Sequence, residues 1–256
     1  MRSDQMSKIW REYRERAVSR EIHPDDHMFN SAVNGWDDYV AVGVSAAEVI
    51  NYVLSAAPSG EVRRFMDFGC GHGRVARHLR AMFPFAEGAF VDIDSSCVEF
   101  CSDKFDGIPI ASKEEFSELK LPGGLDLIWL GSVFTHLDYG RMNALFNLLA
   151  SSLSRHGCLI GTFRGKAMYM RMKGDMERDE STERKWRSLI QQYEAAGVGY
   201  APYNKAENAD WGLSLSSIEA VVGLGRRRGD LNLIAYREAG WAGAHDVAAW
   251  ARMTVD

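Results

Sequence analysis

The amino-acid sequence predicts an α/β fold, a doubly wound and mostly parallel seven-stranded sheet that ends in an antiparallel hairpin. Between residues 61 and 163, short apolar runs alternate with amphipathic helical segments, which is typical of a parallel sheet covered on both faces. A glycine-rich turn follows the first of these runs. The last two apolar stretches, 231–236 and 246–250, are joined by a connection too short for a parallel crossover, so we expect them to pair antiparallel.

Residues 1–60 are predicted to form a helical cap. Apolar residues recur at helical spacing over 5–18, which indicates an amphipathic helix. Ser45 and Glu48 have the spacing of a capping box and predict the start of a second helix.

The remainder, 61–256, is predicted to be the Rossmann-like domain. A long helix is expected over 139–155 and Gly157 is expected to end it, because glycine is favoured just past a helix. The alternation then breaks, so 164–213 is interpreted as an insertion that serves as a lid. The first five strands are predicted at 65–68, 89–93, 108–110, 125–130 and 158–163.

Composition excludes several classes of function. The formal net charge of −5 over 256 residues argues against a dedicated nucleic-acid binder, which needs a basic surface for phosphates. The four cysteines have no metal-ligand spacing and form no disulfide framework, so we expect no metal site and a reducing, cytoplasmic setting. We find neither a signal peptide nor an apolar run long enough to span a membrane.

The most informative segment is the ten-residue stretch Phe-Met-Asp-Phe-Gly-Cys-Gly-His-Gly-Arg at 65–74. Its glycines let the backbone turn tightly and approach a ligand at the start of a helix. Asp92 ends the next strand, 19 residues after Gly73, where a carboxylate can accept both hydroxyls of a ribose. A dinucleotide fingerprint needs glycine where this chain has Arg74, and Asp67 would repel a pyrophosphate. An acid at 67 favours a ligand that carries an ammonium group.

Asp-x-Gly-x-Gly-x-Gly followed by an acidic residue after the second strand resembles class I S-adenosylmethionine-dependent methyltransferases. The stretches 125–137 and 154–160 resemble the same family, and 210–216 with 240–247 is similar to a bacterial subgroup of unassigned substrate. The resemblance implies S-adenosylmethionine as cofactor. It implies a cofactor-binding set of Asp67, Gly69, Cys70, Gly71, Gly73, Asp92, Ile93, Gly131 and Ser132.

Two further cofactor contacts are open at this point. Ser112 stands where many members of the family have an acid that binds the adenine amino group, but Ser112 and Glu115 also have the spacing of a capping box. Tyr39 precedes the core and is a candidate to close over the cofactor.

The acceptor is expected to be a small molecule or a sugar, methylated at a hydroxyl oxygen. A hydroxyl acceptor needs a base, and histidine suits that role near neutral pH. His136 follows the fourth strand and is the first candidate, with a structural histidine at a helix start as the alternative. His245 and Asp246 are a second candidate pair, or else a turn residue and a strand start. N-methylation and a non-catalytic cofactor-binding protein remain alternatives; the sequence predicts no oligomeric state.

Overall fold

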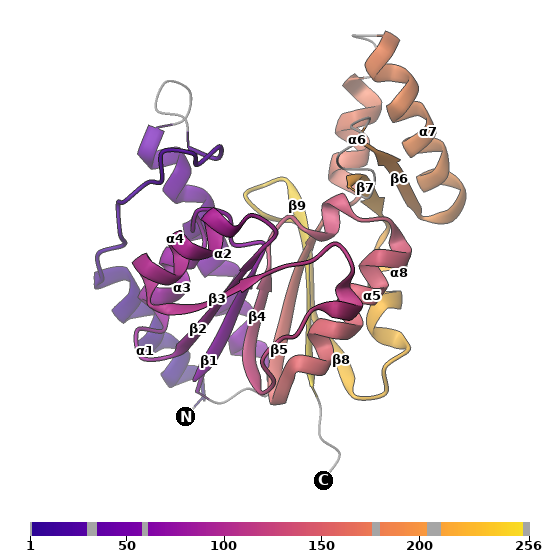
Figure 1. Ribbon diagram of the computed structural model, residues 1–256. Coiled ribbons are helices and arrows are strands. Elements are labelled where there is room, and N and C mark those ends of the chain that lie inside the picture. Colours follow the sequence, from indigo (N-terminus) through magenta and orange to yellow (C-terminus); the bar gives the residue numbers. More distant parts are fainter. Residues whose placement is uncertain (1, 30–34, 58–60, 176–179, 204–210, 253–256) are drawn as a thin grey trace.

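The computed structural model describes residues 2–29, 35–57, 61–175, 180–203 and 211–252. Its centre is a seven-stranded sheet in the order β3-β2-β1-β4-β5-β9-β8 (Figure 1). The first five strands run parallel, whereas β9 is antiparallel to both β5 and β8, which confirms the predicted sheet and its terminal hairpin. The strands are β1 (Arg64–Phe68), β2 (Glu87–Asp92), β3 (Gly107–Ala111), β4 (Leu125–Leu130), β5 (Leu153–Phe163), β8 (Leu231–Trp241) and β9 (His245–Arg252).

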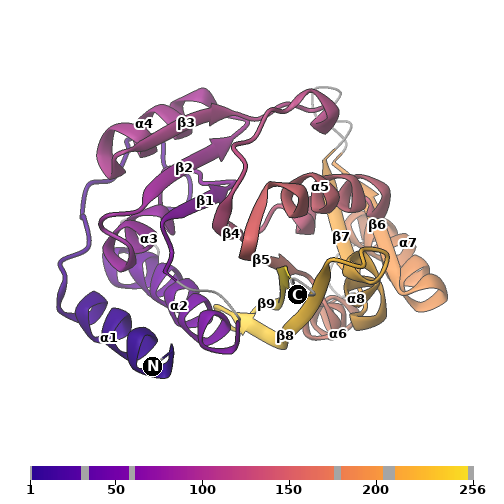
Figure 2. The ribbon, with the colours of Figure 1, turned by 90° about the horizontal axis from the view of Figure 1, so that it is seen from below.

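Helices cover both faces of this sheet (Figure 2). The first four pack on one face, with α1 lying outside α2 and α3, and the helices α5 and α8 pack on the other. The helices are α1 (Arg2–Glu15), α2 (Gly35–Ala56), α3 (Ala76–Met82), α4 (Ser95–Phe105), α5 (Tyr139–Ser152) and α8 (Ile218–Arg226), with short 3-10 turns η1 (Phe116–Glu118) and η2 (Phe134–His136).

The sheet separates two hydrophobic cores, because neighbouring residues of a strand point to opposite faces. In β1, Phe65 joins the core under α2, α3 and α4, while Met66 joins the core under α5 and α8. Both side chains are fully buried. The continuous apolar strands seen in the sequence follow from this two-sided burial.

The second helix begins ten residues earlier than its capping signal predicted. α2 starts at Gly35, so Ser45 and Glu48 lie inside it and the predicted capping box is wrong. The Ser45 hydroxyl instead accepts a hydrogen bond from the backbone N–H of Ala242 at 3.0 Å, in the turn between β8 and β9. By length and composition α2 passes as a membrane-spanning helix, but one side of it, including Ile50, Val53 and Leu54, is buried in the core of the fold.

The prediction that Gly157 ends a helix is also wrong. α5 already ends at Ser152, and β5 begins at Leu153, so Gly157 lies within the strand. A side chain there would meet the Leu125 carbonyl oxygen at 2.3 Å. This glycine permits the close approach of β4 and β5 rather than a helix end.

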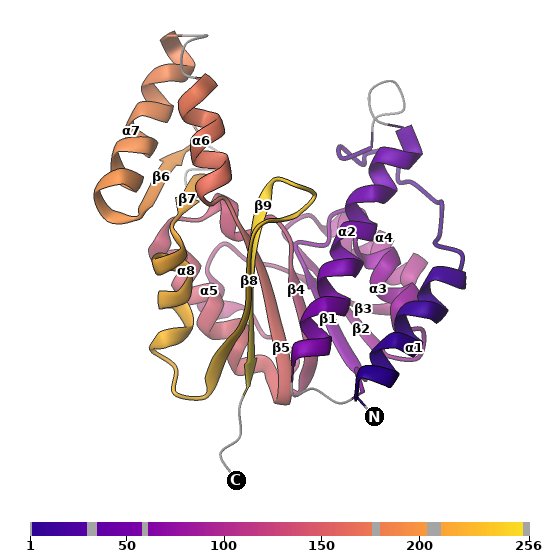
Figure 3. The ribbon, with the colours of Figure 1, turned by 180° about the vertical axis from the view of Figure 1, so that it is seen from behind.

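The chain leaves the main sheet after β5 and returns at α8. The elements in between project beyond the carboxyl end of the sheet (Figure 3) and have their own small apolar cluster. Their second strand contacts the main body, because the backbone N–H of Ser216 donates to the Arg164 carbonyl at 2.9 Å. The elements are α6 (Lys166–Asp175), α7 (Glu180–Ala196), β6 (Val198–Pro202) and β7 (Gly212–Ser216).

A buried polar contact joins α1 to α3. The Tyr13 hydroxyl lies 2.8 Å from Nδ1 of His78, and the other ring nitrogen has no hydrogen-bond partner among the described residues. Burial, together with the charge of Arg77, lowers the pKa of His78 to about 4, so the imidazole is neutral at pH 7. The tyrosine is thus the polar partner of an otherwise unpaired ring.

We expect Tyr13→Phe to lower the free energy of unfolding by about 1–2 kcal/mol, because it leaves both nitrogens of a buried imidazole without a partner. Urea denaturation at pH 7.5 measures this. Tyr52→Phe is the matched control, since Tyr52 is 58% exposed, and we expect a change below about 0.5 kcal/mol. Equal effects of the two substitutions would contradict the assignment.

Candidate active site

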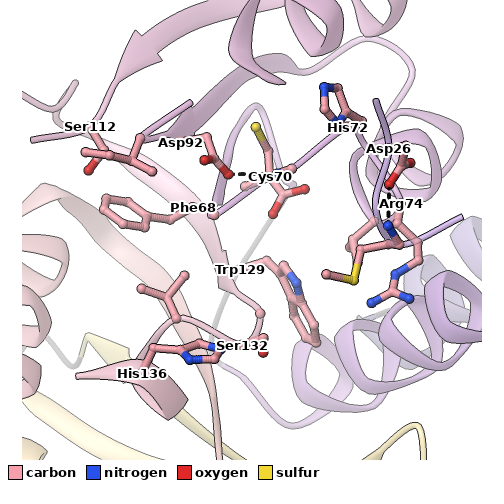
Figure 4. Close-up of a pocket in the computed structure, with 18 of the residues that line it drawn as sticks. Asp26, Phe68, Cys70, His72, Arg74, Asp92, Ser112, Trp129, Ser132 and His136 are labelled. Atoms are coloured by element: carbon pink, nitrogen blue, oxygen red, sulfur yellow. Dashed lines mark hydrogen bonds between the residues drawn. The ribbon is translucent and has the colours of Figure 1, made fainter. Parts of the chain in front are cut away.

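A cavity of about 320 Å³ opens at the carboxyl ends of β1, β2 and β4 (Figure 4). This is the edge of a doubly wound sheet where ligands bind. Predicted site residues that line it are Asp67, Gly69, Cys70, Gly71, Asp92, Ile93, Ser112, Gly131, Ser132 and His136. Lining residues that sequence reasoning did not find are Asp26, Met28, Phe68, His72, Arg74, Val75, Phe116, Trp129, Val133 and Trp241. Trp211, an aromatic residue of the predicted insertion and a candidate from the sequence for the wall of an acceptor pocket, also lines it.

The glycine-rich loop forms the floor of the cavity. Gly69 and Gly71 both have positive φ, at 79° and 49°, a conformation that side chains other than glycine rarely adopt. A side chain at Gly69 would meet Val133 at 2.4 Å, whereas one at Gly71 would meet nothing within 4 Å. Gly71 therefore keeps open space next to a ligand, rather than room for the protein's own packing.

Gly73 was predicted to bind the cofactor, but it does not line the cavity. Its φ is 81°, and a side chain there would meet the Phe105 ring at 2.3 Å and the Cys101 sulfur at 3.3 Å. Gly73 thus permits the loop to pack against α4. The spacing identified the glycine but not which neighbour needed the room.

Asp92 is held at the end of β2 by two backbone donors. Its Oδ2 accepts from the N–H of Gly71 at 2.9 Å, and its Oδ1 accepts from the N–H of Asp94 at 3.1 Å. Each carboxylate oxygen keeps a lone pair for a further donor. The carboxylate is therefore fixed in place beside the loop and able to accept from a ligand.

Asp67 lies at the bottom of the cavity, 1% exposed. Its Oδ2 has no hydrogen-bond partner among the described residues. Burial, and then the charge of Asp92, raise the pKa of Asp67 to about 8. A buried carboxyl group without a partner is costly, and a cationic ligand group would remove that cost.

Apolar side chains line the cavity beyond Asp92. Ile93 is 51% exposed and Phe116 comes from η1, so both offer apolar surface to a ligand. Ser112 lines the same part, fixed by its N–H, which donates to the Asp92 carbonyl at 2.7 Å. No helix begins at Ser112, because η1 starts at Phe116 without a side-chain cap, so the capping interpretation is wrong.

The end of β4 forms the opposite wall. Ser132 has a φ of 62°, a conformation rare for a residue other than glycine. Its N–H donates to the Thr162 hydroxyl at 2.7 Å, which holds the turn. Such conformations cost about 1–3 kcal/mol and cluster at functional sites. The neighbouring Gly131 is required because a side chain there would meet the Trp129 indole nitrogen at 2.7 Å.

His136 lines the cavity on the side of β4 and is oriented through one ring nitrogen. Its Nδ1 lies 3.0 Å from the Gly212 carbonyl and 2.8 Å from the Tyr203 hydroxyl. Since a carbonyl only accepts, Nδ1 carries the proton and Nε2 keeps its lone pair. Burial, and then the charge of Arg164, lower the pKa of His136 to about 4, which keeps the ring neutral at pH 7.

His245 and Asp246 do not form the predicted pair. They are consecutive in β9, so their side chains point to opposite faces of the sheet. Asp246 is fully buried and accepts from the Tyr236 hydroxyl at 2.6 Å and the Ala239 N–H at 2.9 Å. Neither residue lines the cavity. Asp246 is a structural residue that stabilises the β8–β9 hairpin.

The N-terminal strap, defined as residues 16–29, follows α1 on the side of the sheet covered by α1–α4 and ends at the cavity. Arg77, 1% exposed, fixes it. One guanidinium nitrogen donates to the carbonyls of Ser19 at 2.8 Å and Glu21 at 2.9 Å, and Nε donates to the Gly73 carbonyl at 2.8 Å. A buried arginine thus ties the strap to the glycine loop.

Tyr39 supports the strap instead of closing over the cavity. It is fully buried, it does not line the cavity, and its hydroxyl donates to Oδ2 of Asp26 at 2.7 Å. Asp26 and Met28 are the strap residues that reach the cavity, where Asp26 lies near Arg74 (Figure 4). The predicted direct contact is therefore wrong, and the tyrosine positions an acid that sequence reasoning missed.

Comparison with known proteins agrees with this geometry. Residues 66–159 match a family model described as a methyltransferase domain. No curated protein matches the chain in sequence. Among the described residues, no group of three His, Cys, Asp or Glu side chains is arranged to hold a metal ion.

Solved structures share the fold at low sequence identity. One is an S-adenosylmethionine-dependent methyltransferase from Clostridium acetobutylicum, with 12% identity and a TM-score of 0.57 over 89% of this chain and 97% of that one. A second, from Leishmania major, has 15% identity and a TM-score of 0.55 over 96% and 82%. A third is a Burkholderia thailandensis 1,6-didemethyltoxoflavin-N1-methyltransferase with bound S-adenosylhomocysteine, with 12% identity and a TM-score of 0.54 over 98% and 88%.

The domain match shows that residues 66–159 form a methyltransferase domain, and the chain as a whole has the fold of the S-adenosylmethionine-dependent methyltransferases named above. A methyltransferase domain makes the protein an enzyme, and the Burkholderia thailandensis structure that shares its fold contains bound S-adenosylhomocysteine.

We expect Gly71→Ala to fold and to weaken S-adenosylhomocysteine binding at least tenfold, because the added methyl group meets no protein atom but enters the cavity. Isothermal titration calorimetry measures the affinity. Gly243→Ala is the matched control, since Gly243 has a φ of 65° and nothing within 4 Å of an added side chain, so it carries the same backbone strain outside the cavity. Unchanged affinity in Gly71→Ala would contradict the placement of the cofactor over the loop.

Proposed function

We propose that this enzyme methylates a hydroxyl oxygen of a small-molecule acceptor, and that His136 takes the acceptor's proton. The observation that carries the proposal is the orientation of His136. Its Nδ1 is bound to the Gly212 carbonyl, which leaves the Nε2 lone pair available beside the cavity. A neutral, oriented imidazole is the group that a hydroxyl acceptor needs.

In this proposal, the acids at the ends of β1 and β2 hold the cofactor. The unpartnered Oδ2 of Asp67 accepts from the ammonium group, and Asp92 accepts from the ribose hydroxyls beside the Gly71 N–H. Ile93 packs against adenine, with Ser112 at its edge. A single buried oxygen without a partner fits a cation better than it fits any neutral ligand.

The N-terminal strap contributes the other end of the methionine site. Asp26 lines the cavity near Arg74 (Figure 4), whose guanidinium forms no ion pair among the described residues and lies 5.8 Å from the centre of the Tyr39 ring. A guanidinium is the natural partner of a carboxylate. We assign Arg74 to the cofactor carboxylate and Asp26 to the ammonium group, together with Asp67.

When bound, S-adenosylmethionine supplies a methyl group whose bond to sulfur breaks, the electron pair staying on sulfur, as the acceptor oxygen forms its bond to that carbon. The protein's part is to position the acceptor and to remove its proton. The acceptor proton passes to Nε2 of His136, while the carbonyl of Gly212 holds the opposite nitrogen and keeps the ring in place.

We expect cofactor binding to release about one proton at pH 6.5, because the pKa of Asp67 is raised to about 8 and the carboxyl group ionises when it meets the ammonium. The group is protonated below its pKa, so affinity should rise as the pH increases from 6 towards 8. Calorimetry in two buffers of different ionisation enthalpy measures the proton. Asp67→Asn should abolish the release and Asp103→Asn, an exposed control, should not; release that persists in Asp67→Asn would exclude this role.

We expect His136→Asn to lower kcat by about 10²–10⁴-fold with the cofactor Kd unchanged, because the amide keeps a donor for the Gly212 carbonyl but removes the base. Turnover is followed with ¹³C-methyl-labelled cofactor, since NMR separates O-methyl from N-methyl products. His156→Asn, an exposed control, should leave kcat unchanged. An N-methyl product would contradict the proposed O-methylation, and full turnover in His136→Asn would contradict the role of His136 as the base.

The pH profile checks the same assignment. A base acts when unprotonated, and the pKa of His136 is lowered to about 4 by burial and by Arg164. His245 and Tyr203 face the same region, and the pKa of His245 is also lowered to about 4. The wild-type kcat should therefore hold from pH 8 down to about pH 5 and fall below that. A fall in kcat already near pH 6.5 would contradict the lowered pKa of His136.

A further inference from the structure

The acceptor side of the cavity is walled by indole rings. Trp211 lies with its ring centre 6.2 Å from that of His136, and Trp241 stands edge-on to Trp129 at 5.5 Å. Trp241 is fixed, because its Nε1 donates to the Val42 carbonyl at 3.0 Å. These walls come from the residue directly before β7, from β8 and from β4, so they meet only in the folded chain. They offer flat apolar surface beside the proposed base.

The polar groups behind these walls are cationic. Arg164 is partly buried, and among the described residues its guanidinium forms one hydrogen bond, to the Thr135 carbonyl, and no ion pair with a carboxylate. Its charge lowers the pKa of both His136 and His245, so it lies within electrostatic reach of both. Burial lowers the pKa of Arg164, and Tyr203 is the titratable group that acts against this lowering. The region thus favours a negative charge.

Few side chains on this side hydrogen-bond to a polyol. Beside the tryptophans and His136, the hydroxyl of Ser132 is the polar side-chain group that lines the cavity on the side of β4, and it lies 3.3 Å from the Thr135 hydroxyl. A site that selects a sugar needs several fixed polar partners for its hydroxyls. Flat aromatic walls instead suit a planar ring, which stacks on them.

We infer that the acceptor is a planar aromatic molecule with an acidic, phenol-type hydroxyl, whose ring packs against Trp211 and Trp241 and whose oxygen lies beside His136, with the charge of Arg164 behind it. This inference rests on the proposed O-methylation and narrows its substrate class. A phenol ionises near pH 10, as tyrosine does, so a weak base and a nearby guanidinium suffice to remove its proton. An aliphatic alcohol is far less acidic and needs a stronger base.

Binding tests the inference without turnover. The probes are 2-naphthol, decahydro-2-naphthol and methyl glucoside, titrated into the enzyme saturated with S-adenosylhomocysteine. We expect 2-naphthol to bind at least tenfold more tightly than the saturated alcohol. Trp211→Leu should lower the affinity for 2-naphthol by about three- to tenfold and leave the affinity for the saturated alcohol unchanged. Equal binding of the ring and its saturated form, or no binding of 2-naphthol, would overturn the inference.

The absorbance of bound 2-naphthol reports its ionisation and tests Arg164. We expect the bound hydroxyl to ionise at a lower pH than in water, and Arg164→Met to reverse that shift. Arg171→Met, an exposed arginine of α6, is the control. An unchanged ionisation in a folded Arg164→Met protein would overturn the role of the guanidinium; if that variant fails to fold, the Trp211→Leu comparison decides.

Product analysis separates this inference from the function it rests on. Methylation of a sugar hydroxyl but not of naphthol would keep O-methylation and overturn the aromatic acceptor. If naphthol binds tightly in its ionised form but the enzyme methylates only an amine, O-methylation would be overturned and the inference of an aromatic site that favours an anion would stand. O-methylation of naphthol by the wild type, reduced in Trp211→Leu through a higher KM with little change in kcat, is the result expected.

Discussion

The cavity depends on one hydrogen bond, in which the backbone N–H of Gly71 donates to the carboxylate of Asp92 at 2.9 Å. β1 and β2 run parallel, so the chain leaves both strands at the same edge of the sheet. The bond joins the loop after β1 to the end of β2 and so fixes the loop. Gly71 has a positive φ there, which glycine adopts without strain. Asp67, one strand position from the loop, is thereby buried beneath it, and the acidic floor of the site follows from this single link.

Two opposite electrostatic environments share the cavity. Asp26, Asp67 and Asp92 lie along the strap and the ends of β1 and β2, whereas His136 lies at the end of β4 with Arg164 behind it. In a partly buried site, charges act more strongly than in water. The arrangement suits a cationic donor on one side and an acceptor that develops negative charge on the other, which is the charge distribution that methyl transfer to oxygen requires.

Segments outside the methyltransferase domain complete this site. The strap brings Asp26 and Met28 to the cavity, held by the buried guanidinium of Arg77. The segment after β6 and the β8–β9 hairpin bring Trp211 and Trp241. The domain match covers residues 66–159, so the floor of the cavity lies within the matched part, whereas Asp26, Trp211 and Trp241 lie outside it.

The sequence by itself determined the features that local chemistry dictates. The alternation of strands and helices along the chain predicted the sheet. The spacing of Asp67, Gly69, Gly71 and Asp92 predicted the floor of the cavity, because a glycine turn and an acid at a strand end depend only on their neighbours along the chain. Tertiary structure decided the rest. Ser45 has the spacing of a helix cap but lies inside a helix that begins earlier. Gly73 leaves space for the Phe105 ring rather than for a ligand. His245 and Asp246 are consecutive in a strand, so their side chains point to opposite faces of the sheet. Asp26, Trp241 and Arg164 carry no local signal, since only long-range packing brings residues so distant in the chain close to one cavity.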